Sequence, residues 1–157
     1  MEFQVTGARA ASGVESHLGY WLRFVSNHVS HAFSLKLQSR DVTVAEWVIL
    51  RELYGRHATA PSALAERLGM TRGAISKLAD RLAAKALLTR TLSREDRRYQ
   101  SLALTAAGRA LVPRLSALAD RNDAEFFGHL GAAERRAIED AMKEIVRRKA
   151  LKTIPVE

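Results

Sequence analysis

The chain has 157 residues and contains no cysteine, which excludes disulfides, cysteine nucleophiles and cysteine-rich zinc sites. Its 25 lysines and arginines against 17 aspartates and glutamates give a net charge of +8, which favours a polyanionic partner, with nucleic acid ahead of a membrane. The sequence has neither a membrane-span-like apolar run nor a signal-peptide segment at its N-terminus, so we expect a soluble cytoplasmic protein with no membrane partner.

The N-terminal part predicts a loose arm over residues 1–13, followed by a long helix over about 14–37. The helix carries two adjacent apolar stripes, namely Val14, Leu18, Trp21, Leu22, Val25, Val29 and Phe33, and Tyr20, Phe24, His28, His31 and Leu35. This apolar arc is wider than one packing surface needs, as at a subunit interface. We therefore assign residues 14–42 to dimerisation.

The next segment, residues 43–105, predicts three helices and a hairpin. Thr43 and Glu46 have the spacing of a capping box, Val42 and Trp47 that of a hydrophobic staple, and Gly55 is the expected stop. A second helix is expected over about 61–68, with Thr59 and Ala60 as alternative caps. A third helix, which we call the reading helix, is capped by Thr71 and spans 71–84.

Residues 88–92 and 99–104 alternate in part between apolar and polar side chains and flank the polar turn SREDRR, which predicts a β-hairpin. Thr105 then caps a long helix in which Pro113 should cause a bend or a break. A last helix is expected over about 132–150, with Ile138, Met142, Ile145 and Val146 facing inward. The predicted fold class is mainly α with a small β-hairpin wing.

Two short helices joined by a tight turn and followed by a hairpin are the parts of a winged helix-turn-helix, whose second helix enters the major groove. The outer face and first turn of the reading helix carry the candidate DNA-binding residues Thr71, Arg72, Gly73, Ser76, Lys77 and Arg81. Eight basic and three acidic residues lie between positions 72 and 98. The alternative is a solvated charged helix beside a polar loop, but helix pair, hairpin and charge agree.

These segments resemble the MarR family of regulators from about residue 18 to 147. The most specific match is DRRYQSLALT at 96–105, which has the family's pattern of D-x-R, five further residues and L-T. Residues 64–88, with the sequence LAERLGMTRGAISKLADRLAAKALL, look like the family's DNA-recognising helix-turn-helix, which we call the reading head. The resemblance implies an obligate dimer of six-helix subunits, built from the first helix and the last two, so we assign residues 106–151 to dimerisation as well. It also implies that Arg98 enters the minor groove, that Asp96 orients Arg98, and that Arg97 meets phosphate. Without the resemblance, Asp96 and Arg98 would be a routine turn ion pair.

One position departs from the family. Ala86 stands where the family usually has glycine after the reading helix, so we expect this helix to end with a different geometry.

The resemblance also implies a small, anionic aromatic effector between the dimer core and the reading head. Candidate lining residues are Tyr20, Trp21, Phe24, His28, His31 and Trp47. The alternative, which we favour, is that these side chains are core and interface. His17, His28 and His31 could hint at a metal sensor, but packed or solvated histidines are favoured, so no metal site is predicted.

The sequence shows no catalytic constellation, and we predict neither an enzyme nor a cofactor. A protein-docking winged helix and an enzyme acting on a nucleotide or an aromatic compound are the rival classes. The expected function is a homodimeric repressor that binds a pseudo-palindromic operator in duplex DNA, with reading helices roughly 34 Å apart. The sequence leaves open the operator, the regulated genes, the effector, and repression against activation.

Overall fold

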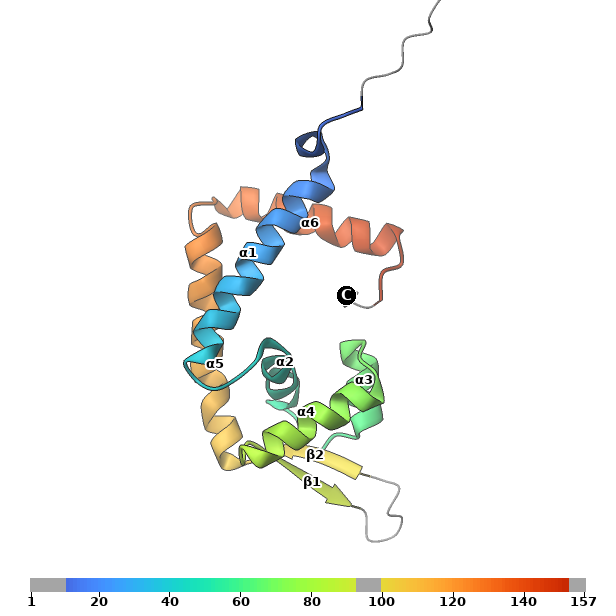
Figure 1. Cartoon of the computed structure of the whole chain (residues 1–157), viewed down its shortest axis with the longest axis vertical. Helices are drawn as coiled ribbons and strands as arrows, with labels where there is room; N and C mark the ends of the chain where they lie inside the picture. Colours follow the sequence, from blue (N-terminus) through green and yellow to red (C-terminus); the bar gives the residue numbers. More distant parts are fainter. Residues whose placement is uncertain (1–10, 93–99, 153–157) are drawn as a thin grey trace, which may run out of the picture.

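The computed structural model describes residues 11–92 and 100–152. In order along the chain, the elements are η1 (Val14–Ser16), α1 (Leu18–Gln38), α2 (Val44–Leu53), α3 (Pro61–Leu68), α4 (Arg72–Ala84), β1 (Leu88–Leu92), β2 (Gln100–Leu104), α5 (Ala106–Phe127) and α6 (Ala132–Arg148). Helices α1 and α5 lie side by side, α6 crosses one end of α1, and α2–α4 gather with the hairpin at the other end (Figure 1). The predicted fold class, mainly α with a small hairpin, is confirmed.

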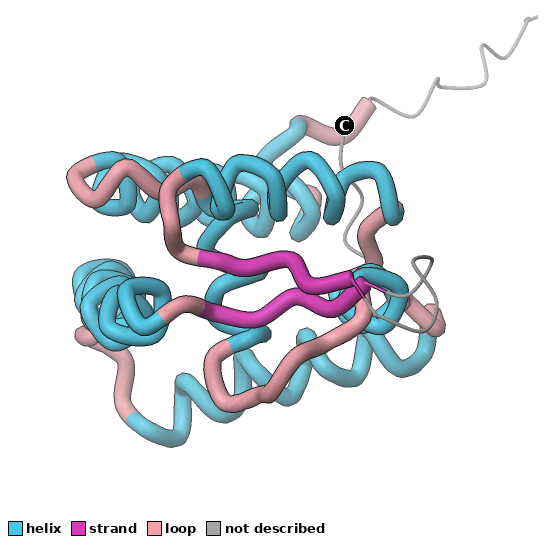
Figure 2. Tube along the Cα trace, turned by 90° about the horizontal axis from the view of Figure 1, so that it is seen from below, coloured by secondary structure: helices cyan, strands magenta, loops and turns pink. Residues whose placement is uncertain are grey.

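The core lies between the hairpin, the three short helices, the C-terminal end of α1 and the N-terminal half of α5. Strands β1 and β2 pair antiparallel from Leu88 opposite Leu104 to Leu92 opposite Gln100, and lie side by side in Figure 2. Thr59 exchanges both backbone hydrogen bonds with Leu102, at 2.9 and 2.8 Å, which ties the loop before α3 to the hairpin. The core is built mainly from the buried side chains Leu37, Ile49, Leu50, Leu53, Leu64, Ile75, Leu82, Leu102, Val112 and Leu115. Ala60 caps α3, which decides between the two caps that the sequence left open.

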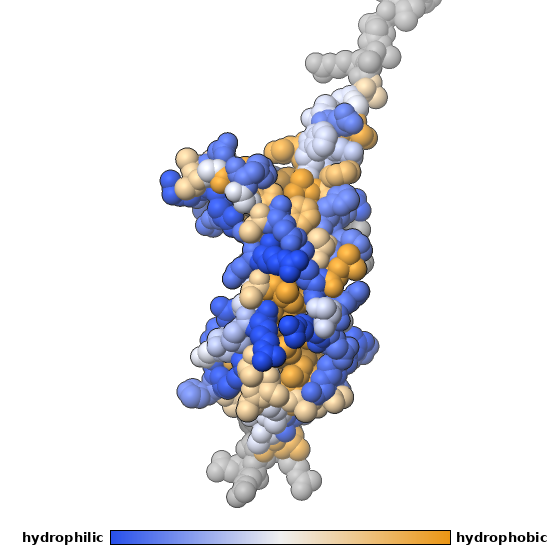
Figure 3. All heavy atoms as spheres, turned by 90° about the vertical axis from the view of Figure 1, so that its left-hand side faces the viewer, coloured by the Kyte–Doolittle hydropathy of each residue, from blue (hydrophilic) through white to orange (hydrophobic). Residues whose placement is uncertain are grey.

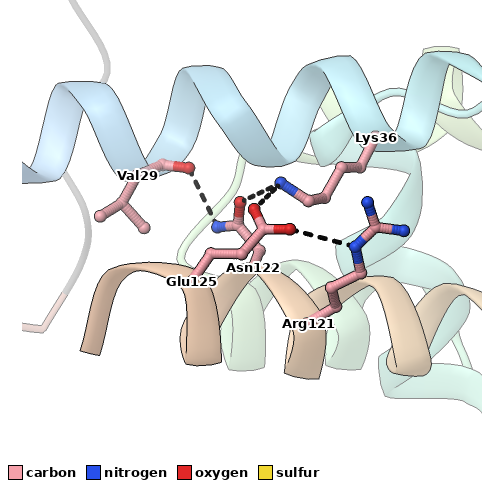
Figure 4. A network of polar contacts seen from close by, with 5 residues as sticks. All are labelled: Val29, Lys36, Arg121, Asn122 and Glu125. Atoms are coloured by element: carbon pink, nitrogen blue, oxygen red, sulfur yellow. Dashed lines mark hydrogen bonds and ion pairs between the residues drawn. The ribbon is translucent and has the colours of Figure 1, made fainter. Parts of the chain in front are cut away.

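A polar network fixes the register of α1 against α5 (Figure 4). Asn122 is 4% exposed; its amide group donates to the carbonyl oxygen of Val29 at 3.2 Å, and its Oδ1 accepts from Lys36 Nζ at 3.1 Å. Lys36 also pairs with Glu125 at 2.6 Å, and Arg121 donates to the same carboxylate at 3.0 Å. These cations hold the pKa of Glu125 below its ordinary value. A buried amide satisfied on both sides permits few other registers.

The predicted helix starts are confirmed by their caps. Thr43 and Glu46 form the complete capping box. Thr71 Oγ1 accepts from Ala74 N at 3.1 Å, and Thr105 Oγ1 accepts from Gly108 N at 3.0 Å. Thr105 Oγ1 also donates to the carbonyl oxygen of Ala86 at 2.7 Å, so the start of α5 is bonded to the end of α4. A methyl group on Gly108 would collide with the carbonyl oxygen of Leu87, so this close approach requires glycine.

Several expectations about helix ends and faces are wrong. The first helix begins at Leu18, because Val14–Ser16 form a separate 3₁₀ turn that ends in the extended residue His17. Helix α2 ends at Leu53 with Tyr54 as its C-cap, and Gly55 does not take the left-handed conformation expected of a stop. Of the two outcomes expected at Pro113, the break does not occur, since α5 continues through this residue.

The face assigned to α6 is also corrected. Helix α6 ends at Arg148, two residues before the expected end, and none of its residues is buried. Ile138, Met142, Ile145 and Val146 are exposed and do not face the interior of the chain. Helix α6 runs across the direction of α1 and α5 and does not lie along them (Figure 1).

The expected change of geometry after α4 does not occur, and Ala86 takes the left-handed conformation itself, with φ at 58°. The amide groups of Ala86 and Leu87 donate to the carbonyl oxygens of Ala83 and Leu82, both at 2.9 Å, which is the Schellman pattern. Asp41 and Gly69 hold the same position after α1 and α3, with φ at 54° and 63°. An L-residue pays roughly 1–2 kcal/mol for this conformation, so Ala86 stores strain.

We expect Ala86→Gly to raise the free energy of unfolding by about 0.5–1 kcal/mol, because relief of the left-handed strain exceeds the added entropy of glycine in the unfolded chain. Urea denaturation at fixed protein concentration measures it. Gly69→Ala is the matched control and should lower the free energy of unfolding by a similar amount. An unchanged or lowered stability of Ala86→Gly would contradict the account of strain.

Candidate functional site

The two sides of α4 differ in chemistry. Ile75, Leu78, Ala79 and Leu82 are buried against the core, as the sequence predicted. The other side carries the exposed residues Thr71, Arg72, Gly73, Lys77 and Arg81. The helix therefore presents a short cationic surface, with the partial positive charge of its N-terminus behind Arg72.

The cations on this surface are available to an outside partner. Within residues 11–92 and 100–152, no ion pair involves Arg72, Lys77 or Arg81. Gly73 leaves open space next to the first turn, since only Thr71 Oγ1 lies near the position of an added Cβ. A polyanion can therefore approach the backbone of α4 closely at this point.

Arg90 on β1 ties the hairpin to α4, a role that the sequence did not predict. Its guanidinium pairs with Asp80 and donates to Ser76 Oγ at 3.2 Å and to Gln100 Oε1 at 3.1 Å. Asp80, the acidic side chain on the outer side of α4, is thereby neutralised. Ser76 is half-buried and accepts from Arg90, so its hydroxyl keeps its own proton and one lone pair for another partner. No spacing rule indicates this contact, because it depends on how the hairpin packs on α4.

An open hollow of about 370 Å³ lies where α3, α4 and the hairpin meet. Its lining residues are Ala60, Pro61, Ser62, Arg72, Ser76, Arg90 and Gln100. Two guanidinium groups and two hydroxyls in one hollow suit an anionic oxygen.

The count of basic residues in the sequence overstates the charge of the surface. Lys85 pairs with Glu46 at 2.9 Å and Arg90 pairs with Asp80, so both cations are compensated within the chain. Asp96, Arg97 and Arg98, the predicted tip of the wing, lie outside the described residues, which resume at Gln100.

The candidate effector residues fall into two separate groups. Tyr20, Trp21, Phe24 and His28 form a chain of ring contacts along α1, with centroid distances of 4.8–6.4 Å. Trp47 on α2 contacts Phe33 instead, at 6.2 Å. The structure therefore does not place Trp47 in contact with the first group. Within the described residues, no three histidines, aspartates or glutamates gather closely enough to hold a metal ion.

Apolar side chains remain exposed on α1 and α6. Trp21, Leu22, Phe24 and Val25 on α1 are 43–49% exposed, and Ile138, Met142, Ile145 and Val146 on α6 are 44–47% exposed. Seen from the side of α5, apolar side chains form a column between hydrophilic ones (Figure 3). Exposed apolar area of this extent marks an interaction surface. None of the described helices is long and apolar enough to span a membrane.

The sequence is similar to those of known transcription regulators. The model of the MarR family matches residues 40–98, which include α2, α3, α4 and β1. The HTH-type transcriptional regulator PrsX of Escherichia coli is 31% identical over 90 residues, which cover 57% of this chain and 54% of PrsX. The chain thus spans about half the length of this curated relative.

Solved structures extend the similarity to most of the chain. MepR of S. aureus, solved as a DNA complex, is 22% identical and superposes with a TM-score of 0.76, covering 84% of this chain and 98% of MepR; it supports the fold. BpsR of Bordetella bronchiseptica is 25% identical with a TM-score of 0.75, covering 86% of this chain and 96% of BpsR. The BpsR structure concerns the regulation of its DNA binding by 6-hydroxynicotinic acid.

Proposed function

We propose that the chain is a transcription regulator of the MarR family that binds duplex DNA as a homodimer. The observation that carries the proposal is the exposed cationic side of α4, where Arg72, Lys77 and Arg81 have no ion pair within the described residues. A helix of this kind fits the major groove, with its arginines and lysine placed for base edges and phosphates.

We assign roles to the residues from this geometry. Thr71 and Gly73 bring the N-terminus of α4 close to a phosphate, while Arg72 and Lys77 contact the DNA backbone. Arg81 and the remaining proton of Ser76 read base edges. Asp96, Arg97 and Arg98 extend the surface into the minor groove at the wing, as the family resemblance implies. A docking module for proteins would not need this basic surface, and the named relative is a transcriptional regulator, not an enzyme.

The homodimer accounts for the exposed apolar side chains of α1 and α6. We assign residues 14–42 and 106–151 to dimerisation, residues 43–105 to DNA binding, and residues 1–13 to an N-terminal arm. Two subunits related by a twofold axis would present two α4 helices to a pseudo-palindromic operator, about 34 Å apart. The mode of regulation that we propose is repression by occupying a promoter, in the cytoplasm.

DNA binding should lose affinity steeply as salt rises, because each phosphate contact releases counterions. We expect Lys77→Met to reduce the slope of log K against log salt by about 1. Arg98→Ala should weaken binding chiefly at A·T-rich flanks. Fluorescence anisotropy on duplexes recovered from a random library measures these effects. Lys152→Met removes one exposed charge beyond α6 and should leave the slope unchanged. A flat salt dependence of the wild type would refute the proposal.

The dimer should dissociate when a charge enters the apolar surface of α6. Ile138→Glu places a carboxylate where the partner subunit would bury it, which should cost roughly 2–5 kcal/mol of association free energy. Sedimentation velocity measures the change. The matched control is Leu92→Glu at an exposed apolar residue of β1, and this variant should remain dimeric. A dimeric Ile138→Glu protein would place the interface elsewhere.

A small anionic aromatic molecule is the effector class that we propose, at the ring cluster of Tyr20, Trp21, Phe24 and His28. The support is the cluster itself and the regulation of BpsR by 6-hydroxynicotinic acid. A panel of aromatic carboxylates that includes this compound should change the fluorescence of Trp21 and release the DNA. Binding that persists unchanged in a Phe24→Ala, His28→Ala variant would remove the cluster from the site.

A further inference from the structure

The proposed function leaves one buried carboxylate unexplained. Glu46 on α2 is 1% exposed, and its Oε2 accepts from the backbone N of Thr43 at 3.0 Å as part of the capping box. The same oxygen pairs with Lys85 Nζ at 2.9 Å. A capping box works with a neutral glutamine as well, so the cap alone does not require a charge here.

Lys85 joins three helices through one ammonium group. It is the residue that ends α4, and its Nζ also donates to the backbone oxygen of Asp41 at 2.5 Å. Asp41 is the left-handed residue that terminates α1, where Val42 N donates to Leu37 O at 3.3 Å. The C-terminus of α4 is therefore bonded both to the corner between α1 and α2 and to the first turn of α2.

This lysine is poorly placed to contact DNA directly. It lies 13 residues beyond Arg72, or about 20 Å along the helix at 1.5 Å per residue. Its side chain is only 27% exposed, and its ammonium is already bonded to Glu46 and Asp41. Its effect on DNA binding must act through the direction in which α4 points.

We propose that Lys85, through Glu46 and the Asp41 carbonyl, is a positioning residue that sets the orientation of α4 relative to α1. The proposal rests on the proposed function, since α1 belongs to the dimer and α4 to the DNA-binding part. A tilt of α4 about its C-terminus moves its N-terminal end most, and that end carries Arg72. In a dimer the tilt occurs twice. The contact of Lys85 with Glu46 and the Asp41 carbonyl, which we call the joint, therefore fixes the distance between the two half-sites that the protein accepts.

The test separates positioning from contact by comparing one half-site with two. Duplexes enriched by the wild type from a randomised library are used in two forms, a full site and a duplex with only one half-site. We expect Lys85→Met to bind the half-site as the wild type does, but to lose roughly 5- to 150-fold on the full site, the range typical of energetic coupling. A fresh selection with this variant should return half-sites with a broader range of spacings.

Matched variants complete the design. Lys77→Met, a proposed DNA contact, should weaken both duplexes, and Lys152→Met should weaken neither. Lys85→Arg keeps the charge and should restore the wild-type spacing. Glu46→Gln keeps the capping box but removes the buried charge, so it should reproduce Lys85→Met and serves if that variant fails to fold.

The outcomes distinguish the two ideas. If the wild type binds no duplex, the proposed function fails and the positioning role fails with it. If the wild type binds but a folded, dimeric Lys85→Met keeps the full-site affinity and the spacing, only the positioning role is refuted. If both Lys85→Met and Glu46→Gln fail to fold, the joint serves the fold alone and the proposal is also refuted.

Discussion

The arrangement of the candidate surface depends on how α4 packs against the core. Ile75 and Leu82 are fully buried with Leu50, Leu64 and Leu102, and this contact fixes which side of a 13-residue helix meets water. An α-helix repeats every 3.6 residues, so burying positions 75, 78, 79 and 82 forces 73, 77 and 81 outward. The cationic surface is thus the necessary complement of the apolar contact. Even without any DNA present, the packing alone presents Lys77 and Arg81 to solvent.

Apolar contacts hold the elements together, and three polar joints fix how they are aligned. Asn122 with Lys36 sets α1 against α5, Glu46 with Lys85 sets α2 against α4, and Arg90 with Asp80 sets the hairpin against α4. Apolar side chains tolerate small slips, whereas a buried amide or carboxylate loses its partners when it slips. An exposed ion pair adds little stability, so the importance of these joints lies mainly in the geometry that they select.

Local signals in the sequence predicted most of the fold, and contacts between distant residues account for what it missed. Thr43, Thr71 and Thr105 mark helix starts because a cap depends only on residues three apart. The buried side of α4 and the pairing of the two strands also follow from short-range periodicity. Arg90 with Ser76, and Lys85 with Glu46 39 residues earlier, could not be predicted, because their meeting depends on tertiary packing. Ala86 was misjudged for a related reason, since the bonds of the Schellman motif and the Thr105 hydroxyl hold it in a conformation that alanine alone disfavours.

The same reasoning explains the wrong assignment of α6. Periodicity identified an apolar side containing Ile138 and Met142 correctly, but it cannot say whether such a side meets its own chain or another one. In the single chain these side chains remain nearly half exposed, and α6 has no buried residue. Removing apolar area from water yields roughly 25 cal/mol per Å², so an apolar side without cover represents stabilisation that a second subunit can supply. In the proposed homodimer, the register of α1 on α5, fixed by Asn122 within one chain, sets how the second subunit sits, and with it the direction of both α4 helices.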